Sequence, residues 1–251
     1  MKNLNWTPAI FFGLLMNLAT ADEVHVAVAS NFAAPMAKIA AEFARDTGNK
    51  ALVSSGGTGK LYAQIKNGAP FEIFLSADEE TPTKLENEGL GVAGSRFPYA
   101  FGRLALWSPK PGYVDPQGNI VKHGKFRHLA IASPKLAPYG RAAQEVLEKQ
   151  GMWQPIQSRL VFGENIAQTH QFVSSGNAEL GFVALSQIRQ DNAEQQGSFW
   201  LVPQAMYTPI RQDAILLARG KGKTAAEQLL KYLKSDKATT IIKRYGYDLP
   251  K

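Results

Sequence analysis

The sequence of 251 residues carries 28 basic and 21 acidic side chains, a formal net charge of +7 at pH 7. The basic residues are scattered and form no stripe interleaved with aromatic residues, so the composition argues against nucleic-acid binding. The chain has no cysteine, which excludes disulfides and a lipid-modified N-terminal cysteine and fits an oxidising compartment.

The first residues have the pattern of a signal peptide rather than of folded structure. Lys2 is the only charge before Asp22, and the apolar run 10–16 is too short to span a bilayer stably. Ala19-Thr20-Ala21 is a small-x-small cleavage signal. We therefore expect residues 1–21 to be removed by cleavage after Ala21, which leaves a periplasmic protein of residues 22–251.

The folded part is predicted to open with a strand, a polar turn and a helix. Residues 24–29 form an apolar run typical of a buried strand, and Ser30-Asn31 follows as a pair of good helix N-caps. The apolar residues of 33–43 then fall on one helical face. In a parallel sheet, polar turns of this kind gather at the carboxyl ends of the strands, where ligands bind.

A second unit of the same kind contains a Gly-rich loop. Strand 51–53 leads into Ser54-Ser55-Gly56-Gly57-Thr58-Gly59-Lys60, and a helix follows through residue 66. Free N–H groups and hydroxyls at a helix start favour a small anion. Ser54 and Leu61 occupy positions that a Walker A motif reserves for Gly and for Ser or Thr, so the loop is not of that kind. A flexible loop with a Ser/Thr helix cap is the alternative interpretation.

Strands and helices alternate through the rest of the chain, which predicts an α/β fold with mostly parallel sheets flanked by helices. Because strand–turn–helix units occur in both halves, we expect two similar lobes with a ligand cleft between them. The first lobe is predicted to comprise 22–101 and 217–251, and the second 102–216. Further strands are expected at 72–78, 103–107, 128–132, 160–162, 180–184, 199–202 and 214–217. Helices are expected through 85, at 142–150, up to 176 and at 224–245, the last with a break near Ser235-Asp236.

Residue patterns of common catalytic and metal sites are missing. The four histidines have no metal-ligand spacing, and the sequence contains neither HExxH nor a G-x-S-x-G nucleophile elbow. Asp78-Glu79-Glu80 is best explained as charge at a helix start. The sequence therefore predicts a solute-binding protein without a cofactor or bound metal cation, not an enzyme.

Several segments in order along the mature chain resemble the periplasmic molybdate-binding proteins of ABC importers, which have the type II-like periplasmic binding protein fold. Gly-Ala-Pro followed by a strand that ends in Ser-Ala-Asp, at 68–78, is the most specific of them. The matching segments are 27–32, 54–64, 68–78, 138–140, 180–183 and 243–247.

The resemblance implies that an oxyanion lies between the lobes. Ser30, Asn31 and Thr58 are the expected ligands from the first lobe, and the backbone around Tyr139 and Ile166 is expected to contribute from the second. Some members of the family have a donor tyrosine at the position of Ala184. We hypothesise that the Tyr139 hydroxyl replaces that donor; the alternative is that Tyr139 is a hydrophobic rim residue.

The resemblance implies capture of molybdate or tungstate and delivery to the membrane permease of an ABC importer, by a protein that we expect to be a monomer. A doubly charged oxyanion carries only acceptors, so neutral N–H and O–H donors can satisfy it without a buried counter-ion. Alternatives that the residues leave open are a binding protein for another tetrahedral oxyanion such as sulfate, an exported hydrolase of phosphate or sulfate esters, and a sensor or adhesin.

Overall fold

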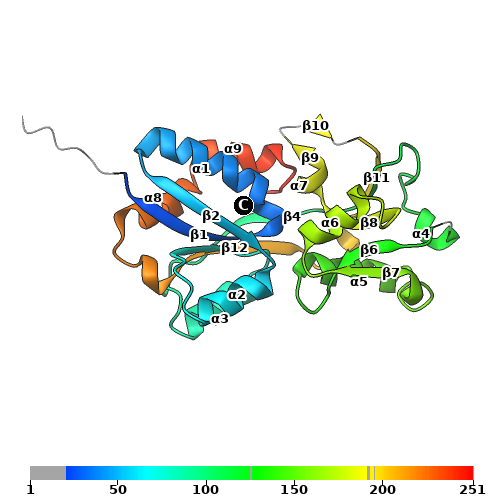
Figure 1. Ribbon diagram of the computed structural model, residues 1–251, viewed down its shortest axis with the longest axis horizontal. Coiled ribbons are helices and arrows are strands. Elements are labelled where there is room, and N and C mark those ends of the chain that lie inside the picture. Colours follow the sequence, from blue (N-terminus) through cyan, green and yellow to red (C-terminus); the bar gives the residue numbers. More distant parts are fainter. Residues whose placement is uncertain (1–20, 125, 191–192, 195, 251) are drawn as a thin grey trace, which may run out of the picture.

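The computed structural model describes residues 21–124, 126–190, 193–194 and 196–250, so the expected signal peptide lies, apart from Ala21, outside the described residues. The chain forms two lobes that lie side by side, each built on a five-stranded sheet (Figure 1). None of the helices in the described ranges is both long and apolar enough to cross a membrane.

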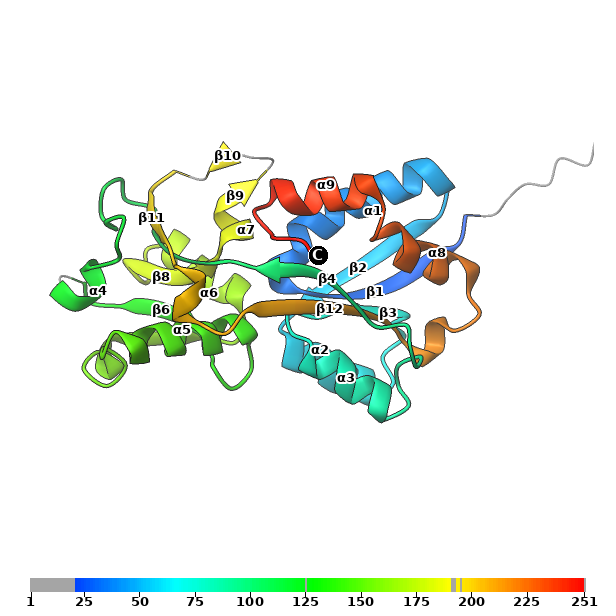
Figure 2. The same ribbon diagram turned by 180° about the vertical axis from the view of Figure 1, so that it is seen from behind.

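The first lobe has the strand order β2-β1-β3-β12-β4. Its strands are β1 (Glu23–Ala29), β2 (Lys50–Gly56), β3 (Ile73–Leu75), β4 (Phe97–Gly102) and β12 (Ile210–Leu216). Helices α1 (Ala33–Thr47), α8 (Thr224–Tyr232) and α9 (Asp236–Arg244) cover one face, and α2 (Thr58–Lys66) and α3 (Glu80–Asn87) cover the other (Figure 2).

Alternation along β1 explains this layering. Val24, Val26 and Val28 pack with apolar residues of α1, α8 and α9, whereas Ala27 packs with Leu61 and its neighbours on the opposite face. Side chains of a strand point alternately to the two faces, so this strand buries both. The strand ends are thereby fixed between two helical layers.

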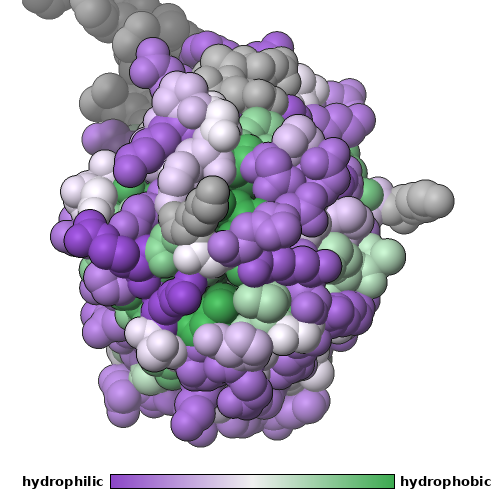
Figure 3. Space-filling model, turned by 90° about the vertical axis from the view of Figure 1, so that its right-hand side faces the viewer, coloured by the Kyte–Doolittle hydropathy of each residue, from purple (hydrophilic) through white to green (hydrophobic). Residues whose placement is uncertain are grey.

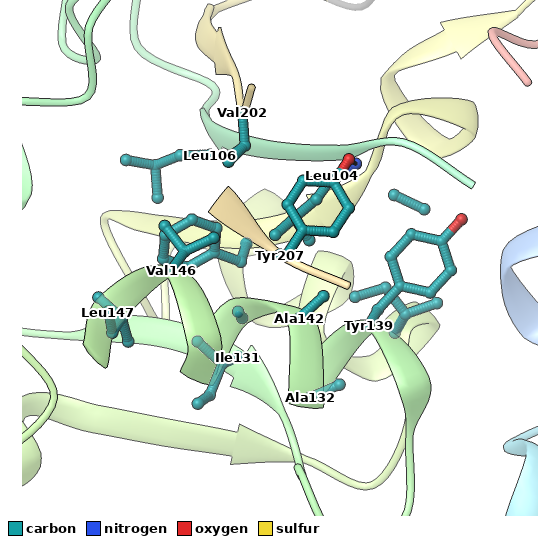
Figure 4. Packing of buried hydrophobic residues seen from close by; sticks show 14 of the residues in the cluster. Leu104, Leu106, Ile131, Ala132, Tyr139, Ala142, Val146, Leu147, Val202 and Tyr207 are labelled. Atoms are coloured by element: carbon teal, nitrogen blue, oxygen red, sulfur yellow. Dashed lines mark hydrogen bonds between the residues drawn. The ribbon is translucent and has the colours of Figure 1, made fainter. Parts of the chain in front are cut away.

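The second lobe has the strand order β11-β5-β8-β6-β7. Its strands are β5 (Leu104–Ser108), β6 (Leu129–Ala132), β7 (Leu160–Gly163), β8 (Leu180–Ala184) and β11 (Ser198–Leu201), beside a small hairpin of β9 (Arg189–Gln190) and β10 (Ala193–Glu194). Its helices are α4 (Ile120–His123), α5 (Pro138–Lys149), α6 (Ile166–Ser174) and α7 (Leu185–Ile188). Figure 4 shows apolar residues of α5 packed against those of β5 and β6.

The two sheets have the same plan, and the two-lobe α/β prediction is confirmed. In the first, β1 pairs in parallel with β2 and β3, and β12 runs antiparallel to β3 and β4. In the second, β6 pairs in parallel with β7 and β8, and β5 runs antiparallel to β8 and β11. Each sheet is therefore mixed rather than mostly parallel.

One expected lobe boundary is wrong. The predicted second lobe, 102–216, includes residues 210–216. These residues form β12, which lies between β3 and β4 in the sheet of the first lobe. The apolar pattern of Ala214-Ile215-Leu216 identifies a strand, but only its partners decide which sheet the strand joins. The chain therefore crosses between the lobes twice, next to Gly102 and through residues 202–209.

The outer end of the second lobe faces the viewer in Figure 3. Hydrophilic residues cover most of this face, and hydrophobic residues show between them.

Candidate anion-binding site

Four turns at helix starts meet between the lobes. In the first lobe, β1 and β2 end at Ala29 and Gly56, in register, and are followed by the 3-10 turn that precedes α1 and by α2. In the second lobe, β6 and β7 end in register at Ala132 and Gly163, before α5 and α6. A helix start presents N–H groups without intrahelical acceptors and the positive end of the macrodipole. The fold thus directs hydrogen-bond donors from both lobes to one place.

A small cavity lies where these turns meet, and no charged side chain is among the described residues that line it. All five predicted ligands contribute to this lining. The lining residues are Ala29, Ser30, Asn31, Gly56, Gly57, Thr58, Ala77, Ala137, Pro138, Tyr139, Asn165 and Ile166. The cavity is suited to an anion that needs donors and no counter-ion.

Thr58 is the first residue of α2 and is almost fully buried. Its Oγ1 accepts a hydrogen bond from the Ala77 N–H at 3.3 Å, so the hydroxyl proton remains available to a ligand. The preceding residue, Gly57, is the N-cap and makes no side-chain cap bond. The first N–H groups of α2 are therefore not satisfied by a cap.

Asn165 lines the cavity from the second lobe and caps α6. Its Oδ1 accepts from the N–H groups of Ala167 at 2.9 Å and Gln168 at 3.1 Å. Ser30 Oγ donates to the same Oδ1 at 3.4 Å, across the boundary between the lobes. The Asn165 side chain therefore accepts from two of the first three N–H groups of α6 and does not accept from that of Ile166.

Asn31 is held by groups from both lobes. Its Nδ2 donates to Gln212 Oε1 at 2.9 Å and to Tyr247 Oη at 3.0 Å. Its carbonyl oxygen accepts from Ser186 Oγ at 2.9 Å and from Tyr247 Oη at 2.7 Å. The Asn31 amide donors are thus already engaged in a buried network.

Tyr139 lies on the second helical residue of α5 and is 1% exposed. In Figure 4 its hydroxyl points away from the other labelled side chains of the cluster, and the oxygen accepts from Gln212 Nε2 at 3.2 Å. Burial raises the pKa of Tyr139 well above its ordinary value, so the hydroxyl stays protonated. Ala184, at the end of β8, is buried and is not among the described lining residues.

Charged residues lie at the rim of the cleft and are paired there. Arg141 of α5 lies 3.6 Å from Asp78 and 3.4 Å from Glu80, so these pairs cross between the lobes. Arg211 pairs with Glu79 at 2.9 Å. These arginines are partly exposed, and such pairs contribute little to stability. Within the described ranges, no group of three or more His, Asp or Glu side chains is placed to hold a metal ion.

Sequence reasoning missed residues that shape the site without matching a motif. Asn165 had a local signal, since an Asn directly before a helix is a strong N-cap. Gln212 and Tyr247 had none, because they reach Asn31 from 181 and 216 residues away. Ala77 contributes through its N–H group, which no side-chain pattern reveals.

Two lobes of the same plan around a small, neutral, donor-lined cavity define the class of binding proteins that hold a small solute between two lobes. Residues 24–248 match the family model of bacterial extracellular solute-binding proteins. The chain belongs to that family. This membership confirms the prediction of a solute-binding protein rather than an enzyme.

Relatives of known name support the same conclusion. The chain is 58% identical over 241 residues to the molybdate-binding protein ModA of Azotobacter vinelandii, covering 96% of each chain. It is 46% identical over 239 residues to ModA of Rhodobacter capsulatus, covering 95% of this chain and 93% of that one. The solved structure of the Azotobacter vinelandii periplasmic molybdate-binding protein superimposes with a TM-score of 0.89 at 45% identity, covering 91% of this chain and 100% of that chain.

Proposed function

We propose that this protein captures molybdate or tungstate in the periplasm and delivers the anion to the membrane permease of an ABC importer. The observation that carries the proposal is the neutral cavity between four helix starts, which offers donors from both lobes and no charged side chain among its described lining. The names of the relatives with 58% and 46% identity support molybdate as the ligand. Export with cleavage after Ala21, and action as a monomer, belong to the same proposal.

In this proposal the hydroxyls of Ser30 and Thr58 donate to the anion from the first lobe. Asn31 contributes its backbone N–H, because its side-chain donors are engaged with Gln212 and Tyr247. The second lobe contributes the first N–H groups of α5 and α6, at Tyr139 and Ile166. The Tyr139 hydroxyl, already an acceptor from Gln212, has its proton available for donation.

A ligand panel on the mature protein tests the function. A ligand that binds only the folded state stabilises it by RT ln(1 + [L]/Kd), about 2.7 kcal/mol at a hundredfold excess over Kd. We expect molybdate and tungstate to raise the melting temperature clearly, and sulfate and phosphate to raise it little at the same concentration. Equal shifts for all four anions contradict the proposed selectivity, and a shift with sulfate alone would identify a sulfate-binding protein.

A further inference from the structure

A buried polar network joins the two lobes behind the cavity, and Gln212 lies at its centre. Gln212 is fully buried on β12, at a register shift in the pairing of β12 with β4. Its Oε1 accepts from Asn31 Nδ2 and from Tyr99 Oη, both at 2.9 Å, and its Nε2 donates to Tyr139 Oη at 3.2 Å. One side-chain amide therefore holds a cavity residue of each lobe.

The chain leaves room for this arrangement at Gly102, where it crosses to the second lobe. A Cβ atom at Gly102 would lie 2.2 Å from Tyr139 Oη and 2.6 Å from Gln212 Nε2. The bond between Gln212 and Tyr139 thus lies directly against one of the two crossing segments. A side chain larger than hydrogen at this position would separate the pair.

We propose that Gln212 is a positioning residue of the anion site, which fixes Asn31 and Tyr139 at the separation that anion binding in the cavity requires. The proposal rests on the proposed function, since it concerns the same cavity. A buried amide that loses its partners costs desolvation free energy, so Gln212 favours the arrangement in which both residues are within reach. Gln212 acts through them and is not among the described residues that line the cavity.

Asn31 and Tyr99 each have a second partner besides Gln212, so Gln212 can be replaced without leaving these two groups unsatisfied. Asn31 Nδ2 also donates to Tyr247 Oη at 3.0 Å, and Tyr99 Oη also donates to a backbone carbonyl at 2.9 Å. Gln212→Met keeps the side-chain length and removes both polar atoms, so we expect a folded protein with a looser site.

A double-mutant cycle with Tyr139→Phe tests the proposal, with Kd for molybdate measured by titration calorimetry. We expect Gln212→Met to raise Kd about three- to tenfold, the effect of one lost neutral hydrogen bond. In the Tyr139→Phe background the same change should raise Kd by a smaller factor, because only the contact with Asn31 is left of the two through which Gln212 acts. Equal effects in both backgrounds, or no effect in the first, overturn the proposal.

A second variant covers the case in which the methionine variant does not fold. Gln212→Asn keeps a buried amide that is one methylene too short to reach both partners, and the same coupling to Tyr139→Phe is expected. Ser108→Ala is the control, because it removes a buried hydrogen bond to the Glu179 carbonyl within the second lobe. It should lower the melting temperature and leave Kd unchanged.

The cycle separates this proposal from the proposed function. Tight molybdate binding by the parent, without coupling between Gln212 and Tyr139, overturns only the role of Gln212. A parent that binds none of the four oxyanions overturns the proposed function, and the role of Gln212 with it.

Discussion

The starts of α2 and α6 occupy matching places in the two lobes and are built differently. Gly57 precedes α2 and makes no side-chain cap bond, whereas Asn165 precedes α6 and accepts from the N–H groups of Ala167 and Gln168. The two residues face each other, since a Cβ atom at Gly57 would lie 3.2 Å from Asn165 Cβ. One lobe thus brings unsatisfied donors to the boundary, and the other brings a helix start that already has its cap.

This difference indicates that the two lobes contribute unequally to the affinity for the anion. A donor without a partner in the protein contributes its full hydrogen bond to a ligand, whereas a capped N–H group must first lose one. We infer that the first lobe, with the Thr58 hydroxyl and the uncapped start of α2, holds the anion. The second lobe then closes over it with Tyr139 and Ile166.

The largest expected effect comes from removing a donor of the first lobe. Thr58→Ala deletes the hydroxyl and leaves the turn glycines intact. A hydrogen bond to a charged group is worth about 1.5–3 kcal/mol, so Kd for molybdate should rise about ten- to a hundredfold. Ser30→Ala should raise Kd by a smaller factor, because the Ser30 hydroxyl also donates a hydrogen bond to Asn165. Titration calorimetry measures both.

Thr83→Ala is the matched control for Thr58→Ala. Thr83 Oγ1 donates to the Glu79 carbonyl at 2.7 Å in an exposed hydrogen bond of α3, outside the cavity. Its replacement should leave Kd unchanged. If Thr58→Ala and Ser30→Ala both bind like the parent, the anion does not lie at this sheet edge and the comparison of the lobes fails.

A smaller loss of affinity should follow when a side chain is added at Gly57, where the two lobes are in contact. Gly57 has φ of −67°, which alanine adopts without strain, but its new Cβ would press on Asn165. Overpacking of this kind costs about 1 kcal/mol or more, so Gly57→Ala should raise Kd at least about fivefold. The melting temperature without ligand should change little if the lobes can separate slightly.

Two further variants isolate the cause. A Cβ at Gly59, also on α2, would lie 3.5 Å from the Leu136 carbonyl, an ordinary contact, so Gly59→Ala should bind like the parent. Adding Asn165→Gly to Gly57→Ala removes the opposing Cβ and should restore affinity. A double variant that binds no better than Gly57→Ala alone shows that the contact between the lobes is not the reason for the loss.

The capped start of the second lobe gives the opposite pattern. Asn165→Ala removes the N-cap of α6 and should lower stability by about 1 kcal/mol. It also frees two N–H groups and the Ser30 hydroxyl, so Kd should stay the same or fall. Ser235→Ala, which removes the N-cap of α9 in the first lobe, is the control for a loss of stability alone. If Asn165→Ala binds molybdate more weakly and Ser235→Ala does not, Asn165 contacts the anion.

The sequence predicted the local units of the fold better than their assembly. The strands that begin near residues 24, 129 and 180, and the helices that follow the first two of them, are predicted from apolar runs and polar turns, and the structure has them. Strand β4 was not predicted, because Phe97-Pro98-Tyr99 contains a proline and shows no clear alternation of apolar and polar residues. The sheet that β12 joins depends on pairing across more than a hundred residues, which no local pattern encodes.

The same division holds at the site. Ser30, Asn31 and Thr58 lie at strand ends where the sequence predicts ligands, and Tyr139 and Ile166 were predicted from the resemblance. The engagement of the Asn31 side chain with Gln212 and Tyr247 follows only from tertiary packing. A residue's type and its place on a turn can be predicted, but the partners that already occupy its polar atoms cannot.

The smallest expected effect is that of pH on binding, because no described residue that lines the cavity titrates near neutrality. Among the described lining residues only Tyr139 is ionisable, and burial raises its pKa. Kd for fully ionised molybdate should therefore be constant between about pH 6 and pH 9. Calorimetry across that range measures it, and a change of tenfold would reveal an ionising group that the comparison of the lobes omits.

The buried tyrosines should make stability respond to pH in the alkaline range. Burial raises the pKa of Tyr99, Tyr139 and Tyr247 in the folded state. Below about pH 10 both the folded and the unfolded chain keep these protons, so the contribution of the tyrosines to stability is fully present. Above about pH 10 the unfolded chain releases protons that the folded chain retains, so the free energy of unfolding must fall as pH rises.

Tyr139→Phe removes one of the three groups. Denaturant unfolding should therefore show that the free energy of unfolding declines less steeply at alkaline pH in this variant. An unchanged decline would mean that the Tyr139 hydroxyl is not buried in solution, and that the second lobe does not close on the first as the structure shows.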